Sequence, residues 1–168
     1  MENFWRTILW QQFGAILEMY EQTLHACPDE LWREPLWHDP TDDPAYTEFW
    51  FIAYHTLFWL DVYLTGSRDG FVPPVPFVAG RLPAKPYTKA ELLVYLAHCR
   101  HKCRATLAAM SDEKAQQPYL FPWDEEVSFA EMQIHSLRHV QEHTSQLSLL
   151  LGRKGVAAPD WVPNIKAV

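Results

Sequence analysis

Three histidines follow one another at four-residue steps in the segment HSLRHVQEHTSQLSLLLG. They are His135, His139 and His143. A helix advances about 100° per residue, so a four-residue step returns a side chain to nearly the same face one turn later. Two imidazoles placed in this way can bind one metal ion, because neutral imidazole is a common protein ligand for zinc, nickel, copper and iron. If the segment is helical, its spacing predicts a metal-binding face.

A helical wheel divides the three histidines into two groups. With His139 at the origin, His143 lies at about 40°, and the apolar residues Met132 and Leu150 lie near 20°. The charged residues of the segment lie on the other side, toward which His135 leans. The wheel therefore favours His139 and His143 as inward-facing ligands, with His135 at the rim as a proton relay or a substrate contact.

A third ligand is expected from another part of the chain. His55 lies in the strongly apolar segment EFWFIAYHTLFWLDVYL, where a buried imidazole needs polar partners. Metal coordination would satisfy one of its nitrogens. Glu48, placed two turns earlier on the same face, is a candidate hydrogen-bond acceptor, further ligand or proton relay.

A simpler interpretation accounts for the same histidines without a metal. A pair at this spacing arises readily by chance in a chain with eight histidines. All of them could be residues at the edge of the core that bond to carbonyl groups or water. The apolar surroundings of His55 favour the metal site over this alternative.

The composition limits the class of protein. A chain of 168 residues with 48% apolar residues is long enough for one domain with a hydrophobic core. Its net charge of -7 argues against binding to nucleic acid. The amino-terminal segment lacks the features of a secretory signal, and the apolar stretch from Phe49 to Leu60 is too short to cross a bilayer. Three cysteines without framework spacing indicate a reducing compartment, so we expect a cytoplasmic protein without a membrane partner.

The hydrophobic pattern predicts four helices and no strand within a single domain, 1–168. Local signals place the start of three helices: Asp43 followed by a proline, and the capping boxes that begin at Thr88 and Ser128. Gly152 is the expected end of the last helix, and Trp161 is the expected anchor of an irregular tail, 155–168. The predicted helices cover residues 4–26, 43–65, 88–110 and 128–151. With long connectors between them, they indicate an all-α, four-helix bundle with crossover connections.

Other groups that could do chemistry have simpler explanations. Cys99 and Cys103 continue an apolar stripe on the third predicted helix, so we interpret them as small buried hydrophobic residues. Aromatic residues could line an apolar substrate cleft, although each of them fits the core equally well. These aromatic residues are Trp37, Trp50, Phe58 and Trp59.

The chain resembles the DinB/YfiT-like superfamily. Members commonly read HHRGQ on the closing helix, where this chain reads EHTSQ and so keeps His143 and Gln146. The segment around His55 is similar to the second helix of the family, which carries a single metal-binding histidine. The resemblance covers most of the chain and implies a four-helix bundle with a divalent metal held by His55, His139 and His143.

The resemblance also implies a range of functions. Family members include thiol-dependent S-transferases and a mycothiol-dependent maleylpyruvate isomerase. We therefore expect a metal-dependent transferase, with a low-molecular-weight thiol as cosubstrate, or a hydrolase of a small molecule. Zinc or nickel is the expected metal, with iron or manganese as alternatives. The other interpretation is a noncatalytic metal-binding or stress-response protein, and a homodimer is one option for its assembly.

Overall fold

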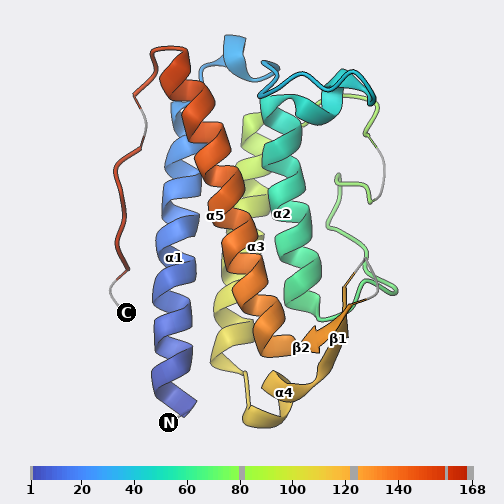
Figure 1. Ribbon diagram of the computed structural model, residues 1–168, viewed down its shortest axis with the longest axis vertical. Helices are drawn as coiled ribbons and strands as arrows, with labels where there is room; N and C mark the ends of the chain where they lie inside the picture. The colour runs from blue at the N-terminus through green and yellow to red at the C-terminus, as the bar shows by residue number, and fades with distance from the viewer. Residues whose placement is uncertain (1, 80–81, 122–124, 158, 166–168) are drawn as a thin grey trace.

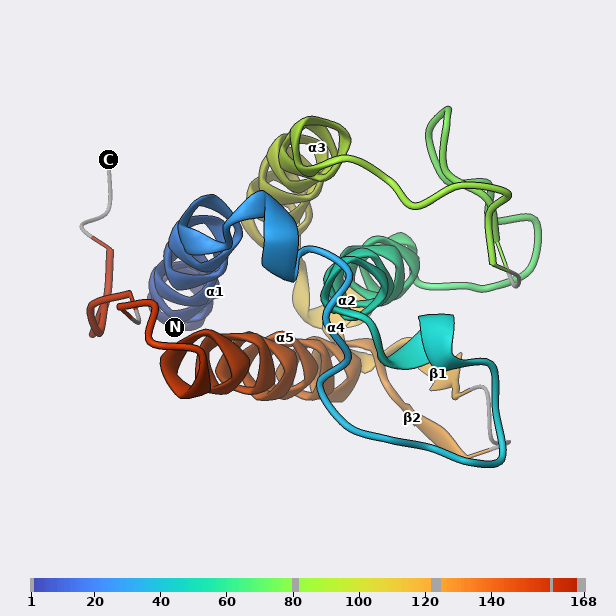
Figure 2. The ribbon, with the colours of Figure 1, turned by 90° about the horizontal axis from the view of Figure 1, so that it is seen from above.

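Four long helices form the body of the protein in a computed structural model that describes residues 2–79, 82–121, 125–157 and 159–165. Helices α1 and α5 run in one direction, and α2 and α3 run in the other (Figure 1). Seen from above, α1 and α2 each lie between α3 and α5 (Figure 2). The predicted all-α, four-helix bundle is confirmed. The four helices are α1 (Glu2–Ala26), α2 (Phe49–Thr65), α3 (Lys89–Ala108) and α5 (Phe129–Arg153).

A long crossover joins the parallel helices α2 and α3. This proline-rich connector leaves α2 at one end of the bundle and returns along its side to the other end, where α3 begins (Figure 1). Phe77 and Tyr87 are buried and attach the connector to the core. At the start of α3, the Thr88 side chain accepts a hydrogen bond from Glu91 N, and the Glu91 carboxylate accepts one from Thr88 N. The predicted capping box is therefore formed.

Helix α2 begins later than predicted. Asp43 accepts a hydrogen bond from Ala45 N, but the turn that it caps is a separate 3-10 helix, Pro44–Thr47. Glu48 is extended, with φ -69° and ψ 148°, and the α-helix starts at Phe49. The break arises because the preceding connector pairs with this segment: Leu36 N donates to Thr47 O, and Phe49 N donates to Glu34 O.

The end of the chain also differs from the prediction. Helix α5 continues through Gly152, and the positive φ of 78° that follows its end belongs to Gly155. Trp161 is 69% exposed and is a weaker anchor of the tail than expected. Ile165 packs directly against Gly14 of α1, where an added Cβ would lie 2.0 Å from Ile165 Cδ1. The missing side chain at position 14 makes room for the tail.

Two short strands and a short helix connect α3 to α5. Helix α4 (Asp112–Gln116) is followed by β1 (Pro118–Leu120) and β2 (Glu126–Ser128), which pair antiparallel. The prediction that the chain contains no strand is therefore wrong. Strands of three residues are too short for an alternating pattern to be recognised. Ser128 caps α5 by accepting a hydrogen bond from Glu131 N, which is one of the two hydrogen bonds of the predicted capping box.

Most residues of α2 are buried, and they contribute to two hydrophobic clusters that form the core. Cys99 and Cys103 of α3 are 0% exposed and belong to the same core, which confirms their interpretation as small hydrophobic residues. None of the helices in the described parts of the chain is long and apolar enough to cross a membrane.

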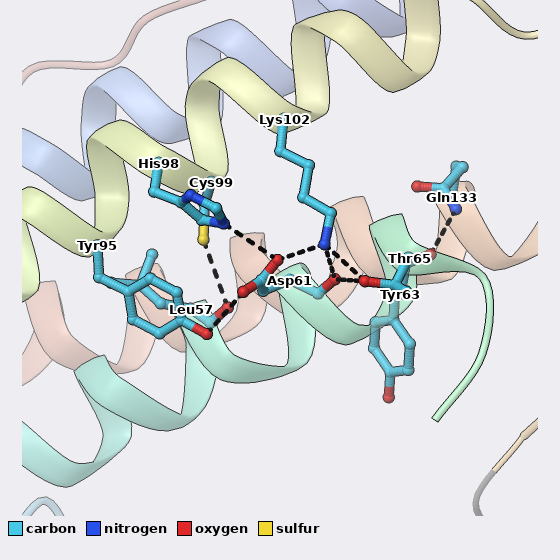
Figure 3. Close-up of polar contacts among 9 residues, drawn as sticks. All are labelled: Leu57, Asp61, Tyr63, Thr65, Tyr95, His98, Cys99, Lys102 and Gln133. Carbon is cyan, nitrogen blue, oxygen red and sulfur yellow. Dashed lines mark hydrogen bonds and ion pairs between the residues drawn. The ribbon is translucent and has the colours of Figure 1, made fainter. Parts of the chain in front are cut away.

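A buried carboxylate ties α2 to α3 (Figure 3). Asp61 is 1% exposed; its Oδ1 accepts a hydrogen bond from Lys102 Nζ at 2.5 Å, and its Oδ2 accepts one from Tyr95 Oη at 3.0 Å. Lys102 Nζ also donates to Thr65 Oγ1, and His98 Nε2 lies 3.5 Å from Asp61 Oδ1. Both carboxylate oxygens are therefore engaged.

Removing the lysine should destabilise the protein, because it leaves this carboxylate buried without its cation. We expect Lys102→Met to lower the free energy of unfolding by roughly 2–3 kcal/mol, less than for a fully buried ion pair because the lysine is partly exposed. The double variant Asp61→Asn with Lys102→Met should recover part of this loss. Urea unfolding of the three proteins measures both effects, and equal losses in the single and double variants would contradict the explanation.

Candidate metal centre

Three imidazole nitrogens converge between α2 and α5. His139 Nε2 lies 3.3 Å from His55 Nε2 and 3.1 Å from His143 Nε2. One ligand nitrogen of each ring lies within 4.8 Å of the others, and this is the group in the described part of the chain that could hold a metal ion. The structure thus brings together the three residues that the sequence proposed as ligands.

The helix geometry explains this convergence. Helices α2 and α5 are antiparallel neighbours along the bundle (Figures 1 and 2). His139 and His143 are one turn apart on α5, and Val140 and Leu147 are buried beside them and fix that face toward the core. His55 meets the pair from the middle of α2.

Burial keeps the three rings neutral. Burial, together with the smaller effect of the neighbouring His143, lowers the pKa of His55 to about 4. Burial also lowers the pKa of His139, as do the three surrounding histidines. Burial lowers the pKa of His143 as well, opposed by its hydrogen bond with Gln146. At neutral pH the rings are therefore in the form that binds metal ions.

A hydrogen bond sets the proton position on one ring. His143 Nδ1 lies 2.8 Å from Gln146 Oε1, an acceptor, so this nitrogen carries the proton. His143 Nε2 then presents its lone pair toward His139. Gln146 belongs to the EHTSQ motif on which the family resemblance rests, and the structure shows the contact that it makes.

The spacing of the nitrogens fits a metal ion. Two ligands of a tetrahedral ion at about 2.0–2.1 Å from the metal are separated by about 3.3 Å. The two nitrogen separations of 3.1 and 3.3 Å are close to this value. Three histidines would leave at least one coordination position for another molecule. The donor set and its spacing therefore match an open metal site.

Aromatic rings surround the histidines. Phe51 and Trp59 pack against His55, with ring centroids 6.2 and 6.3 Å away, and Tyr63 packs against His139. Of the four aromatic residues proposed as cleft walls, Trp59 makes a ring contact with a ligand histidine. Trp50 is buried in the core, Phe58 packs on Tyr54 and Trp59, and Trp37 is 43% exposed.

His135 lies beside the histidine group. Its ring is half-buried, stacks on His139 at 6.4 Å and contacts Tyr63 and Phe121. Burial, followed by the charge of Arg138, lowers its pKa. The helical wheel placed this residue at the rim, and it lies next to the candidate ligands without belonging to their group.

Glu48 is engaged elsewhere. Its carboxylate accepts hydrogen bonds from Arg33 at 2.9 and 3.0 Å and from Trp50 Nε1 at 2.5 Å, and it lies outside the candidate ligand group. The wheel placed Glu48 on the face of His55 by assuming one helix from residue 43. Because α2 begins at Phe49, that geometry does not extend to Glu48. Arg33 belongs to the preceding connector, and no local sequence pattern predicts its ion pair with Glu48.

Comparisons with known proteins agree with the fold and with the family resemblance. A sequence model of the DinB superfamily matches residues 12–147, which include His55, His139, His143 and Gln146. Among solved structures, the chain is similar to YjoA, a DinB-like protein from Bacillus subtilis, with a TM-score of 0.61 and 13% identity. That likeness covers 92% of this chain and 97% of the other, and at this identity it concerns the fold alone. No curated protein matches the chain.

The lowered pKa values predict how the metal-free protein responds to acid. An unfolded histidine takes up a proton near pH 6.5, whereas folded His55 resists protonation until about pH 4. Below pH 6.5 the unfolded state therefore binds more protons, and stability should fall as the pH falls toward 4. Urea unfolding with a chelator present, at a series of pH values, measures this loss.

The variant His139→Gln identifies the source of the acid sensitivity. It removes one of the buried rings, so its stability should fall less steeply over the same pH range than that of the parent protein. His25→Gln changes an exposed histidine on α1 and should follow the parent. Parallel pH profiles for the parent and His139→Gln would contradict this account.

Proposed function

Because the chain belongs to the DinB superfamily, we propose that it is a metal-dependent enzyme that acts on a small molecule. The proposed ligands are His55, His139 and His143. The convergence of their three Nε2 atoms is the observation that supports the proposal most directly. The hydrogen bond from His143 to Gln146 supports it further, because it directs a lone pair toward the other two rings.

Zinc or nickel is the proposed metal. Imidazole nitrogens suit zinc, nickel, copper and iron, whereas manganese prefers oxygen ligands, so iron ranks above manganese as an alternative. When bound, the ion would act as a Lewis acid and lower the pKa of a coordinated water or thiol group. This chemistry fits two reaction classes, transfer of a low-molecular-weight thiol to an electrophile and hydrolysis of a small molecule.

The residues around the ligands suggest how the protein would assist. His135 is kept largely neutral by burial and lies next to His139, so it is the first candidate to accept or return a proton. Glu48 is a weaker candidate, because it would first have to leave Arg33 and Trp50. Trp59 and Tyr63 present apolar rings that would shield the reacting groups from water.

A cytoplasmic setting fits the same proposal. Cys27, Cys99 and Cys103 are all free and buried, as expected for a reducing compartment. The net charge of -7 favours a small molecule over nucleic acid as the partner.

Metal analysis tests the site directly. We expect the purified protein to hold close to one equivalent of zinc or nickel per chain. His55→Ala and His139→Ala should each abolish most of this binding, because two remaining imidazoles cannot hold the ion tightly. His101→Ala changes an exposed histidine of α3 and serves as the control. Unchanged metal content in His55→Ala and His139→Ala, measured by inductively coupled plasma mass spectrometry, would rule out the three-histidine site.

A substrate screen tests the reaction class. The metal-loaded protein is assayed with glutathione and other cysteine-based thiols against 1-chloro-2,4-dinitrobenzene, and separately with p-nitrophenyl esters. We expect turnover in one assay, with a fall of about 10²-fold in His135→Ala at unchanged metal content, the typical contribution of an acid–base group. If the metal is bound but neither class of substrate reacts, the noncatalytic metal-binding interpretation replaces the enzyme.

A further inference from the structure

Three buried polar atoms on α5 have no hydrogen-bond partner within the described residues. They are Gln133 Oε1, Ser136 Oγ and His139 Nδ1. Gln133 and Ser136 are both 0% exposed, so solvent outside the protein does not reach their side chains. Buried polar groups are nearly always bonded to protein or to ordered water, so three unpaired atoms on one helix require an explanation.

The three residues are evenly spaced on one helix. Each step of three residues rises about 4.5 Å and turns about 60° around the axis. Ser136 therefore lies between Gln133 and His139, both along the helix and around it. Side chains of a helix lean toward its amino-terminal end, so the His139 ring lies over the turn that holds Ser136.

The Ser136 hydroxyl departs from the pattern of the buried threonine hydroxyls in the α-helices. Thr23, Thr56 and Thr144 each donate to the backbone carbonyl four residues earlier. This is the usual bond of a serine or threonine inside a helix. Ser136 makes no such bond and keeps its hydroxyl available for another partner.

Metal binding by His139 would create a need for such a partner. A ring that coordinates through Nε2 carries its proton on Nδ1, and a coordinating histidine almost always donates that proton to an acceptor. His143 Nδ1 has Gln146 Oε1 for this purpose, whereas His139 Nδ1 has no acceptor within bonding distance among the described residues. A serine hydroxyl can accept a hydrogen bond from the Nδ1–H group of His139 and donate one to Gln133 Oε1.

Gln133, the residue farthest from the metal site among these three, already has one hydrogen bond to α2. Gln133 Nε2 donates to the backbone oxygen of Tyr63 at 3.1 Å, which attaches the glutamine to α2 (Figure 3). Two hydrogen bonds remain to be formed, from His139 Nδ1 to Ser136 Oγ and from Ser136 Oγ to Gln133 Oε1. Each can form by rotation of the serine side chain or through one buried water, which typically bonds to two to four polar groups. With these bonds, each residue donates to the next: His139 to Ser136, Ser136 to Gln133, and Gln133 to the backbone of α2.

We propose that Ser136 and Gln133 form a hydrogen-bond chain that holds His139 with its proton on Nδ1 and its Nε2 lone pair toward the metal. This inference rests on the proposed function, since the tautomer matters only if His139 binds the ion. Ser136 and Gln133 are positioning residues: they act through His139 and do not touch the metal.

The affinity of the protein for Co²⁺ and Zn²⁺ tests the proposed hydrogen-bond chain. We expect Ser136→Ala to weaken binding by about 10–100-fold, the usual effect of removing a partner of a coordinating histidine, and to change the visible spectrum of the Co²⁺ protein. Gln133→Met should weaken binding by a smaller factor, and Ser136→Thr, which keeps the hydroxyl, should bind more tightly than Ser136→Ala.

Thr144→Val is the matched control, because it removes an equally buried hydroxyl from the same helix that bonds to its own backbone. It should leave the metal affinity and the Co²⁺ spectrum unchanged, even if it lowers the urea midpoint of the metal-free protein. If Ser136→Ala binds the metal as tightly as the parent, or if Ser136→Ala and Thr144→Val lose metal affinity equally, the proposed hydrogen-bond chain is overturned.

A high-resolution crystal structure of the metal-free protein separates this inference from the metal site. It should show Ser136 Oγ joined to His139 Nδ1 and Gln133 Oε1 directly or through one ordered water. If the parent binds none of Co²⁺, Zn²⁺ and Ni²⁺, the proposed function fails, and the crystal structure alone decides on the hydrogen bonds. Density that leaves Ser136 unbonded to both neighbours would overturn the chain.

Discussion

The close approach of three imidazole nitrogens between α2 and α5 is the contact that the rest of the structure must support. His139 Nε2 lies 3.1 and 3.3 Å from the Nε2 atoms of His143 and His55. Gln146 keeps the proton of His143 on Nδ1, and burial disfavours further protonation of any of the rings. Two lone pairs at this distance repel unless a proton or a cation lies between them. One proton can relieve one such contact, whereas one metal ion can relieve all of them.

Each of the two helices that meet at the histidines is held by contacts on another face. On the side of α2 that faces α3, Asp61 is bonded to Tyr95 and Lys102. Helix α5 packs against α1, where Ser148 lies within hydrogen-bond distance of Thr23. Interiors packed at crystal-like density resist small displacements, so these attachments hold the two histidine-bearing helices at a fixed separation. Such rigidity is what a coordination site with narrow distance limits requires.

The regular parts of this architecture could be predicted from the sequence because they depend on local patterns. The periodicity of apolar residues identified the helices, and the same wheel separated His139 and His143 from His135. The largest error lies where distant segments interact. Pairing of residues 34–36 with residues 47–49 interrupts the predicted second helix, and the Glu48 carboxylate bonds to Arg33 and Trp50. Gly152 and Gly155 look alike as helix stops, and the observed positive φ at Gly155 distinguishes them.

The two polar clusters of the interior differ in how completely their polar atoms are paired. The oxygens of Asp61 all have partners, including Lys102 and Tyr95, so that cluster is complete without any added group. On α5, by contrast, His139 Nδ1 and Ser136 Oγ are buried and unpaired within the described residues, next to rings whose lone pairs converge. Natural proteins keep unsatisfied polar groups in the core mainly where function requires them. Three unpaired atoms of the described residues lie on α5, at Gln133, Ser136 and His139, and none belongs to the Asp61 carboxylate. This contrast supports the proposal that the interface of α2 and α5 carries the function, whereas the contacts between α2 and α3 stabilise the bundle.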